Sequence, residues 1–228
     1  MIENILQIIA PHYCCGCKKI GSPLCSSCIY NITDEQNNTC INCGKLARDG
    51  ACSECRQIVA YQKGWCAGTR DEALKELINS YKFSYVKAAH KPLASLLDQT
   101  MPILPSGTIV VPIPTIGKHI RQRGYDHAHL LAKTVARQRR IHCLALLRRK
   151  NNTVQREAIG AKEREIQAKE AFKCPQKLEA STPYLIVDDV ITTGATVRAA
   201  AKCLQQSGAK KIFIAAAARQ PLDLGQDL

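Results

Sequence analysis

Two adjacent carboxylates and a run of small residues follow an apolar segment in the last quarter of the sequence. Asp188 and Asp189 come directly after residues 184–187 (YLIV), and residues 192–196 (TTGAT) follow two positions later. Small residues let backbone N–H groups approach a phosphate, and threonine hydroxyls add further donors. Carboxylates beside such a loop can accept hydrogen bonds from sugar hydroxyls or hold Mg²⁺. The segment therefore predicts a site for a ribose 5-phosphate group.

A strand that ends at the carboxylates and a helix that begins behind the loop would position this site. Ligands of open α/β sheets bind beyond the carboxyl ends of the strands, and a helix N-terminus favours an anion. An ordinary turn capped by threonine would explain one threonine, but not Asp-Asp followed by Thr-Thr-Gly-Ala-Thr. No Gly-x-x-x-x-Gly-Lys occurs in the chain, which argues against a loop that holds a nucleoside triphosphate.

Eight cysteines in the N-terminal quarter form four Cys-x-x-Cys pairs. Seven residues separate the first two pairs, and eight separate the last two. Each pair offers two thiolates from one tight turn, and two pairs complete a tetrahedron around Zn²⁺. The predicted ligands of two structural zinc ions are Cys14, Cys17, Cys25, Cys28, Cys40, Cys43, Cys52 and Cys55.

The regularity of the pairs favours metal over free or disulfide-bonded cysteine. Near-equal spacing indicates a duplicated unit with one ion for each consecutive quartet; a cross-braced arrangement, in which the first pair joins the third, would close longer loops and stays an alternative. Four thiolates leave no open coordination position, so catalytic zinc is not expected. The ions would supply folding energy to residues 12–55, which are too poor in apolar residues to form a core of their own.

After residue 65 the hydrophobic pattern alternates between helices and strands. The predicted helices span residues 71–81, 127–138 and 196–206, and the predicted strands span residues 108–112, 143–147, 184–187 and 211–218. This alternation predicts an α/β fold, in which helices flank a parallel sheet. We expect a double zinc-ribbon domain over residues 1–60 and the α/β domain over residues 61–228.

The positive charge is concentrated in one stretch of the 228-residue chain. Of the formal net charge of +13, residues 117–169 supply +10, with fourteen Lys/Arg against four Asp/Glu. Such a concentration favours an anionic partner over a merely solvated face. The first residues lack the basic and apolar regions of a secretory signal, and no stretch reaches the roughly 18 apolar residues of a membrane span. We expect a cytoplasmic protein without membrane insertion, in which clustered cysteines indicate metal.

Residues 184–196 resemble the 5-phosphoribosyl 1-pyrophosphate (PRPP) motif of type I phosphoribosyltransferases. In that family, the adjacent acids contact the ribose hydroxyls and the following loop binds the 5′-phosphate. The resemblance implies that Asp188 and Asp189 bind the ribose of PRPP, which Mg²⁺ accompanies. The implied phosphate-loop residues are Thr192, Thr193, Gly194, Ala195 and Thr196.

Further motifs extend the resemblance to the ComF family over nearly the whole chain. Residues 111–114 (VPIP), 121–128 (RQRGYDHA) and 153–155 (TVQ) are similar to that family, as are the cysteine pairs; an Asn-Gln pair is more usual where Asp126 and His127 stand. ComF proteins combine a zinc ribbon with a type I phosphoribosyltransferase-like fold and are associated with natural competence. The resemblance therefore implies single-stranded DNA as a partner, together with a competence helicase and recombination factors.

The resemblance also gives roles to the basic stretch. Pro112, Ile113 and Pro114 would belong to a pyrophosphate loop, and residues 148–169 match a mobile active-site flap. Arginine suits such positions because its planar fork binds phosphate through two hydrogen bonds. The residues expected to take part in chemistry at PRPP are Asp188, Asp189, Arg121 and Arg123. The residues expected to contact nucleic acid are Lys118, Arg121, Arg123, Arg148, Arg149 and Lys150.

Three functions fit these features. The first is a DNA-handling protein of DNA uptake that binds a PRPP-like ligand and single-stranded DNA. The second is an active phosphoribosyltransferase, in which pyrophosphate leaves PRPP and an unknown acceptor attacks; the third is a regulator that senses PRPP. The chain lacks an N-terminal cysteine-nucleophile domain that would release ammonia from glutamine, which disfavours the glutamine-dependent first step of purine synthesis. The sequence leaves open whether the protein is an enzyme.

Overall fold

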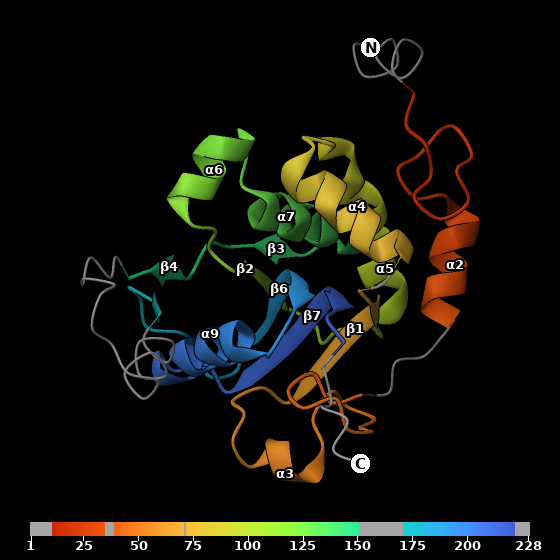
Figure 1. Cartoon of the computed structure of the whole chain (residues 1–228). Coiled ribbons are helices and arrows are strands. Elements are labelled where there is room, and N and C mark those ends of the chain that lie inside the picture. Colours follow the sequence, from red (N-terminus) through yellow and green to blue (C-terminus); the bar gives the residue numbers. More distant parts are fainter. Residues whose placement is uncertain (1–10, 35–38, 71, 151–170, 222–228) are drawn as a thin grey trace, which may run out of the picture.

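A five-stranded sheet forms the centre of the computed structural model, which describes residues 11–34, 39–70, 72–150 and 171–221 (Figure 1). The strand order is β1-β7-β6-β2-β3, and every neighbouring pair is parallel. The strands are β1 (Lys63–Thr69), β2 (Ile109–Pro112), β3 (His142–Cys143), β6 (Pro183–Ile191) and β7 (Lys211–Arg219). The predicted α/β class with a parallel sheet is confirmed.

The central strands are apolar on both sides because helices cover both faces of the sheet. Successive side chains of a strand point to opposite faces. In β6, Leu185 and Val187 belong to one buried cluster, whereas Tyr184 and Ile186 belong to the other. The continuous apolar run of this strand therefore serves two cores, one on each side of the sheet.

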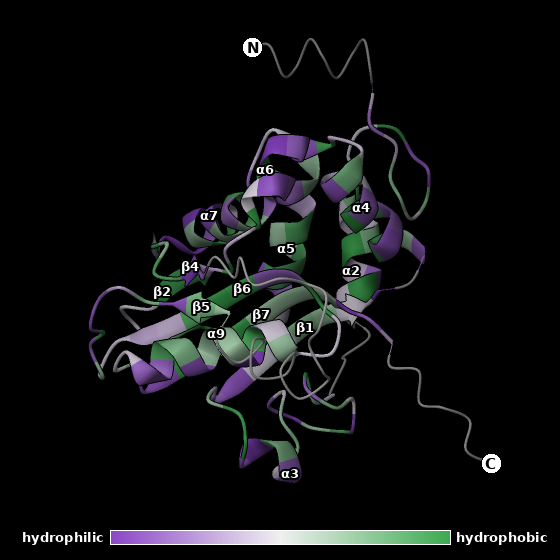
Figure 2. Ribbon diagram, turned by 60° about the vertical axis from the view of Figure 1, so that its left-hand side comes forward, coloured by the Kyte–Doolittle hydropathy of each residue, from purple (hydrophilic) through white to green (hydrophobic). Residues whose placement is uncertain are grey.

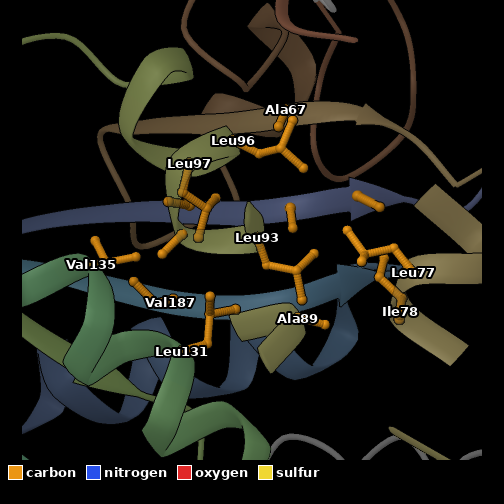
Figure 3. Packing of buried hydrophobic residues seen from close by; sticks show 14 of the residues in the cluster. Ala67, Leu77, Ile78, Ala89, Leu93, Leu96, Leu97, Leu131, Val135 and Val187 are labelled. Atoms are coloured by element: carbon orange, nitrogen blue, oxygen red, sulfur yellow. The ribbon is translucent and has the colours of Figure 1, made fainter. Parts of the chain in front are cut away.

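Three helices pack on the first face: α4 (Glu72–Phe83), α5 (His90–Thr100) and α7 (His127–Arg139). A short 3₁₀ helix, η1 (Lys87–Ala89), leads into α5. Figure 3 shows their contact with the sheet, where Leu93 and Leu97 of α5 lie near Leu131 and Val135 of α7. Full burial of such leucines contributes roughly 2 kcal/mol each. The first core holds these three helices against the sheet.

The opposite face carries α9 (Ala195–Gln206), which buries a stripe of small residues and Leu204 against β6 and β7. Gly208 ends the helix at φ +115°, where an added Cβ would lie 2.5 Å from the carbonyl oxygen of Leu178. This glycine suits the end of the helix for two reasons, its backbone conformation and the lack of space for a side chain.

The two cysteine segments pack against different cores. Residues Cys14, Leu24 and Ile29, the last from α2 (Ser26–Asp34), join the cluster beneath α4, α5 and α7. Cys40 and Ile41, from the segment that leads to α3 (Ser53–Arg56), join the cluster beneath α9. Figure 1 shows α2 and α3 on either side of the sheet. Each cysteine segment is thus stabilised by packing against one of the two cores of the α/β fold.

Polar surface elements border the sheet beyond β2. Helix α6 (Gly117–Arg123) contains no buried residue and is mostly hydrophilic in Figure 2. A second, two-stranded antiparallel sheet pairs β4 (Arg148–Arg149) with β5 (Phe172–Lys173). The expected flap falls mainly on residues 151–170, which lie outside the described residues; β4 and β5 flank them.

Several predicted elements have different bounds in the structure. The strand expected over residues 143–147 is wrong, because β3 ends at Cys143 while Leu146 and Leu147 bury their side chains outside any strand. The strand expected over residues 184–187 continues to Ile191, so that the two aspartates lie within it.

Candidate phosphoribosyl site and cysteine clusters

The two adjacent aspartates of β6 occupy opposite sides of the strand. Asp189 has the parity of Leu185 and Val187 and is buried on the side of α4 and α7. Asp188 has the parity of Ile186, faces the other side and is half-buried. The two carboxylates therefore lie in different environments, although the sequence places them side by side.

Asp189 is held by a largely buried cation from α4. Its Oδ1 lies 2.8 Å from Nζ of Lys82, and the exposed fractions of the two side chains are only 3% and 20%. Its Oδ2 lies 3.4 Å from Nε2 of His127 and has no hydrogen-bond partner among the described residues. A buried carboxylate oxygen that lacks a hydrogen bond is costly, and so it marks a position where a ligand donor or a cation would be favoured.

His127 connects this carboxylate to the arginine at the end of α6. Arg123 Nη1 lies 2.9 Å from His127 Nδ1. Because a guanidinium can only donate, Nδ1 accepts, and the neutral imidazole then carries its proton on Nε2, which lies 3.4 Å from Asp189 Oδ2 without forming a hydrogen bond to it. Burial lowers the pKa of His127 to about 4, against an opposing effect of Asp189, which keeps the ring neutral at pH 7. Tyr81 fixes the start of α7 by donating its hydroxyl to the His127 carbonyl at 2.7 Å.

Asp188 has a strongly perturbed carboxyl group. Burial and the neighbouring charge of Asp189 raise the pKa of Asp188 to about 8. One of its oxygens, Oδ1, accepts the backbone N–H of Asp189 at 2.9 Å. A carboxyl group with a pKa near neutrality, at the carboxyl edge of a sheet, is a feature typical of binding and catalytic sites.

The predicted pyrophosphate loop lies directly beside this carboxyl group. Pro112 is the last residue of β2 and pairs with Val187, the residue before Asp188. Ile113 continues this contact by donating its N–H to the Val187 carbonyl at 3.3 Å. From β4, Arg149 donates its Nε to the carbonyl of Pro114 at 2.8 Å, and its guanidinium stacks 5.1 Å from the centre of the Phe172 ring. Burial lowers the pKa of Arg149, while the charge of Asp188 opposes that shift.

The predicted phosphate loop joins β6 to α9. Gly194 is the N-cap residue of α9 and has φ +71°, a conformation that glycine adopts without strain. Thr192, Thr193 and Thr196 are exposed, and Ala195 begins the helix. The loop therefore offers hydroxyl donors at the positive end of a 12-residue helix.

The cations predicted to bind nucleic acid are distributed over α6 and β4. Lys118, Arg121, Arg148 and Lys150 are exposed. Arg123 is instead half-buried, with its guanidinium 5.2 Å from the centre of the Phe83 ring. Four of these cations are thus exposed, whereas Arg123 and Arg149 are half-buried with their guanidinium groups against aromatic rings.

The eight predicted cysteine ligands come together as two consecutive quartets, Cys14/Cys17/Cys25/Cys28 and Cys40/Cys43/Cys52/Cys55. Within each quartet the four sulfur atoms lie within 4.8 Å of one another. The distance between the sulfurs of Cys17 and Cys25 is 3.7 Å, and that between Cys43 and Cys52 is 3.6 Å. A tetrahedral zinc ion with Zn–S bonds of about 2.3 Å separates its sulfurs by about 3.8 Å. Both quartets therefore fit a structural metal ion, in the sequential pairing.

One sulfur of each quartet is prepared for the thiolate form. Burial raises the pKa of Cys14, but backbone N–H groups directed at its sulfur outweigh this effect and lower the pKa to about 6. The same opposing causes lower the pKa of Cys40 to about 7. Donors directed at sulfur suit an anionic ligand, because a metal-bound cysteine is deprotonated.

Four residues near the predicted sites were not found from the sequence. Tyr81 and Lys82 lie in the last turn of α4, whose amphipathic pattern indicates the buried face but not a charge partner for Lys82. Arg198 of α9 donates to the carbonyl of Thr193 at 2.9 Å and also to the side chain of Asn42. The position of Asn42 inside the third Cys-x-x-Cys pair was the available signal for a role of this residue near the metal.

Together, the parallel sheet flanked by helices, the loop after its central strand and the two cysteine quartets define an α/β protein whose N-terminal segments could hold two metal ions. No family model matches the chain. It is 30% identical over 225 residues to competence protein F of Haemophilus influenzae, in a match that covers 86% of this chain and 96% of that protein. The chain belongs to the competence protein F (ComF) family.

Two proteins named competence protein ComFC are also similar to the chain. The one from Bacillus subtilis is 24% identical, covering 83% of this chain and 81% of that protein. The one from Streptococcus pneumoniae is 25% identical, covering 84% and 85%.

Similar solved structures include the allosteric regulatory enzyme of purine biosynthesis (19% identity, TM-score 0.40) and glutamine PRPP amidotransferase from B. subtilis (20% identity, TM-score 0.38). Each match covers 57% of this chain and 26% of the other chain. Within the described residues, no helix has both the length and the apolar character needed to cross a membrane.

Proposed function

We propose that this protein takes part in DNA uptake by binding a phosphoribosyl ligand such as PRPP at the β6–α9 loop and single-stranded DNA on the cations of α6 and β4. The named relatives are competence proteins, which supports the cellular role. The zinc ions proposed for the two cysteine quartets stabilise the N-terminal segments against the two cores.

One observation carries the ligand proposal. The phosphate loop with Gly194 at the N-terminus of α9 and the Pro112–Pro114 segment lie at the same carboxyl edge of the sheet, on either side of Asp188. A 5′-phosphate on the loop would leave the ribose beside the carboxyl group and the pyrophosphate beside the β2 segment. This arrangement supports a ligand that carries phosphate at both ends of a ribose.

Asp188 gives this proposal a measurable signature. Burial and the charge of Asp189 raise the pKa of the Asp188 carboxyl group to about 8, so the neutral form is favoured more than in an ordinary aspartate. A Mg²⁺ ion that accompanies PRPP favours the carboxylate form, so binding releases a proton from this residue. The ligand-dependent proton release is therefore expected to vanish in Asp188→Asn.

Calorimetric titration of PRPP, with and without Mg²⁺, tests the ligand proposal. We expect binding that needs Mg²⁺, and a loss of at least tenfold in affinity for Asp188→Asn. Absence of binding to the wild-type protein rejects the proposal. Pyrophosphate release, measured with a panel of bases and amines, separates a binding protein from an active transferase: release that depends on an acceptor and disappears in Asp188→Asn would establish transfer.

The proposed DNA surface is electrostatic. Arg121 and Arg148 are exposed on α6 and β4, and Lys118 and Lys150 are exposed nearby. Binding of a single strand by such cations weakens steeply with salt, because each phosphate contact releases counterions. We expect charge reversal of both arginines to abolish binding of an oligothymidylate strand at 150 mM salt. Unchanged affinity in that variant would exclude this surface as the DNA site.

A further inference from the structure

A single amide side chain joins the second cysteine quartet to the phosphate loop. Asn42 lies between Cys40 and Cys43, and its Nδ2 donates to the sulfur of Cys55 at 3.0 Å. Its Oδ1 accepts from Nη1 of Arg198. The same nitrogen of Arg198 donates to the carbonyl of Thr193 at 2.9 Å. A continuous chain of hydrogen bonds therefore leads from a predicted metal ligand to the backbone of the loop.

The chemistry of its two neighbours fixes the orientation of this amide. A guanidinium can only donate, so it selects the oxygen of Asn42. A metal-bound thiolate can only accept, so it selects the nitrogen. Both ends of the side chain are used, and a flipped amide would lose both hydrogen bonds at once.

Gly194 of the loop packs against the same two side chains. A Cβ atom added to Gly194 would lie 3.2 Å from Nη1 of Arg198 and 3.5 Å from Cα of Asn42. Beside this contact is a cavity of about 620 Å³ between the second cysteine segment and α9, bordered by Ile58 and Lys202. The Asn42–Arg198 bond is thus a polar connection between the segment and the loop at the edge of this cavity.

The first quartet offers an internal comparison. Its equivalent position, the third residue of the first Cys-x-x-Cys pair, is Gly16. A Cβ atom there would lie 2.7 Å from the sulfur of Cys28, so no side chain is accommodated. The first quartet packs beneath α4, α5 and α7, on the other side of the sheet from α9. Within the described residues, the connection through an asparagine side chain is therefore found at the second quartet and not at the first.

We infer that Asn42 and Arg198 are positioning residues through which the second metal site and the phosphate loop stabilise each other. This inference rests on the proposed function, because it concerns the same phosphoribosyl site. Partners of metal ligands fix ligand orientation, and their loss typically costs 10–100-fold in metal affinity. Coupling between two sites is reciprocal, so a ligand held by the loop slows loss of metal from the second quartet, and metal at that quartet strengthens ligand binding.

Zinc release from the full-length, zinc-loaded protein tests the inference. A chelating dye in excess reports the ions as they leave, and we expect two phases, one from each quartet. Asn42→Ala should accelerate one of the two phases, and this identifies that phase as zinc release from the second quartet. In the wild-type protein, saturating PRPP with Mg²⁺ slows that phase by about tenfold, within the usual range of coupling, and leaves the other phase unchanged.

Two variants separate the steps of the bridge. Arg198→Ala keeps the Asn42–Cys55 bond but removes the connection to Thr193, so PRPP binds roughly tenfold more weakly and no longer slows zinc release. Lys45→Ala, the matched control, removes an exposed ion pair with Glu54 in the same cysteine segment and keeps the full effect of PRPP. Should Asn42→Ala not fold, Arg198→Ala decides the question.

The possible failures are distinguishable. If calorimetry shows no PRPP binding to the wild-type protein, the proposed function and this inference are both rejected. If PRPP binds but leaves both phases of zinc release unchanged, only the inference is overturned. The same holds if Arg198→Ala retains both the affinity and the slowing.

Discussion

Nζ of Lys82 lies 2.8 Å from Oδ1 of Asp189, and this buried ion pair joins the last turn of α4 to the carboxyl end of β6. A cation near a helix C-terminus is also favoured by the helix dipole. The ammonium group of Lys82 compensates a carboxylate whose burial without a partner would be costly. The pair therefore fixes one of the two predicted ribose ligands within the core.

Lys82→Met is expected to lower the free energy of unfolding by about 3–5 kcal/mol, because removing one partner leaves a buried charge uncompensated. Denaturant unfolding measures the change. The double variant Lys82→Met/Asp189→Asn should recover more than half of the loss, since no charge then remains to be buried.

An exposed ion pair of the same helix serves as the control. Lys18 and Glu76 of α4 approach to 2.6 Å, but both side chains are more than half exposed. Lys18→Met should leave the unfolding midpoint unchanged within error. A similar loss in Lys18→Met and Lys82→Met would show that the position of Lys82 in the core is unimportant.

Because His127 is buried, we expect the folded protein to lose stability in acid. The pKa of His127 is about 4 in the folded protein, below the ordinary value of 6.5, because it is buried. Between these two values the unfolded chain binds the proton more readily, so stability is lost as pH falls from about 6.5 to 4, by roughly 3 kcal/mol in total. His127→Gln removes the titrating group. As pH falls across this range, the unfolding free energy of the wild-type protein should therefore decrease relative to that of the variant. A difference between the two proteins that does not change with pH contradicts the assignment.

The sequence predicted the parts of the site that depend on short segments. The strand before Asp188, the loop behind it and the metal quartets each lie within a few tens of residues, so local pattern was sufficient. Strand β1 (KGWCAGT) was missed because its glycines and lysine hide the apolar pattern, and it pairs with β7, about 150 residues away. The partners Lys82 and His127 of Asp189 were missed for the same physical reason: they reach the carboxylate only through tertiary packing of α4 and α7.

Gly194 and Gly107 form a matched pair for testing the phosphate loop. Their φ values are +71° and +75°, but an added Cβ meets Asn42 and Arg198 at Gly194 and nothing within 4 Å at Gly107. Replacement by alanine should cost about 1 kcal/mol of stability through backbone strain at either position. In calorimetric titrations only Gly194→Ala should weaken PRPP binding, by about tenfold. Equal effects of the two substitutions on binding would show that the loop does not bind the ligand.

Removal of metal is expected to loosen the two faces of the fold independently. Each quartet packs against a different core, through Cys14 and Leu24 on one side and Cys40 and Ile41 on the other. Elemental analysis should find two zinc ions per chain, and chelation should abolish hydrogen-exchange protection in residues 12–34 and 39–55, while β6 and β7 stay protected. Release of one ion or none contradicts the two-site assignment.

Arg148 and Arg149 are neighbours in β4 with opposite surroundings, and we expect them to separate the two proposed binding activities. Arg148 is exposed, whereas Arg149 donates to the carbonyl of Pro114 at 2.8 Å and stacks on Phe172. Arg148→Ala should weaken single-stranded DNA binding and reduce the slope of log affinity against log salt by about 0.7, the value for one phosphate contact, with PRPP binding unchanged. Arg149→Ala should instead weaken PRPP binding, because the β2 segment beside Asp188 loses its support. If the two substitutions affect both ligands equally, DNA and PRPP share one site, and the assignment of the exposed cations to DNA is wrong.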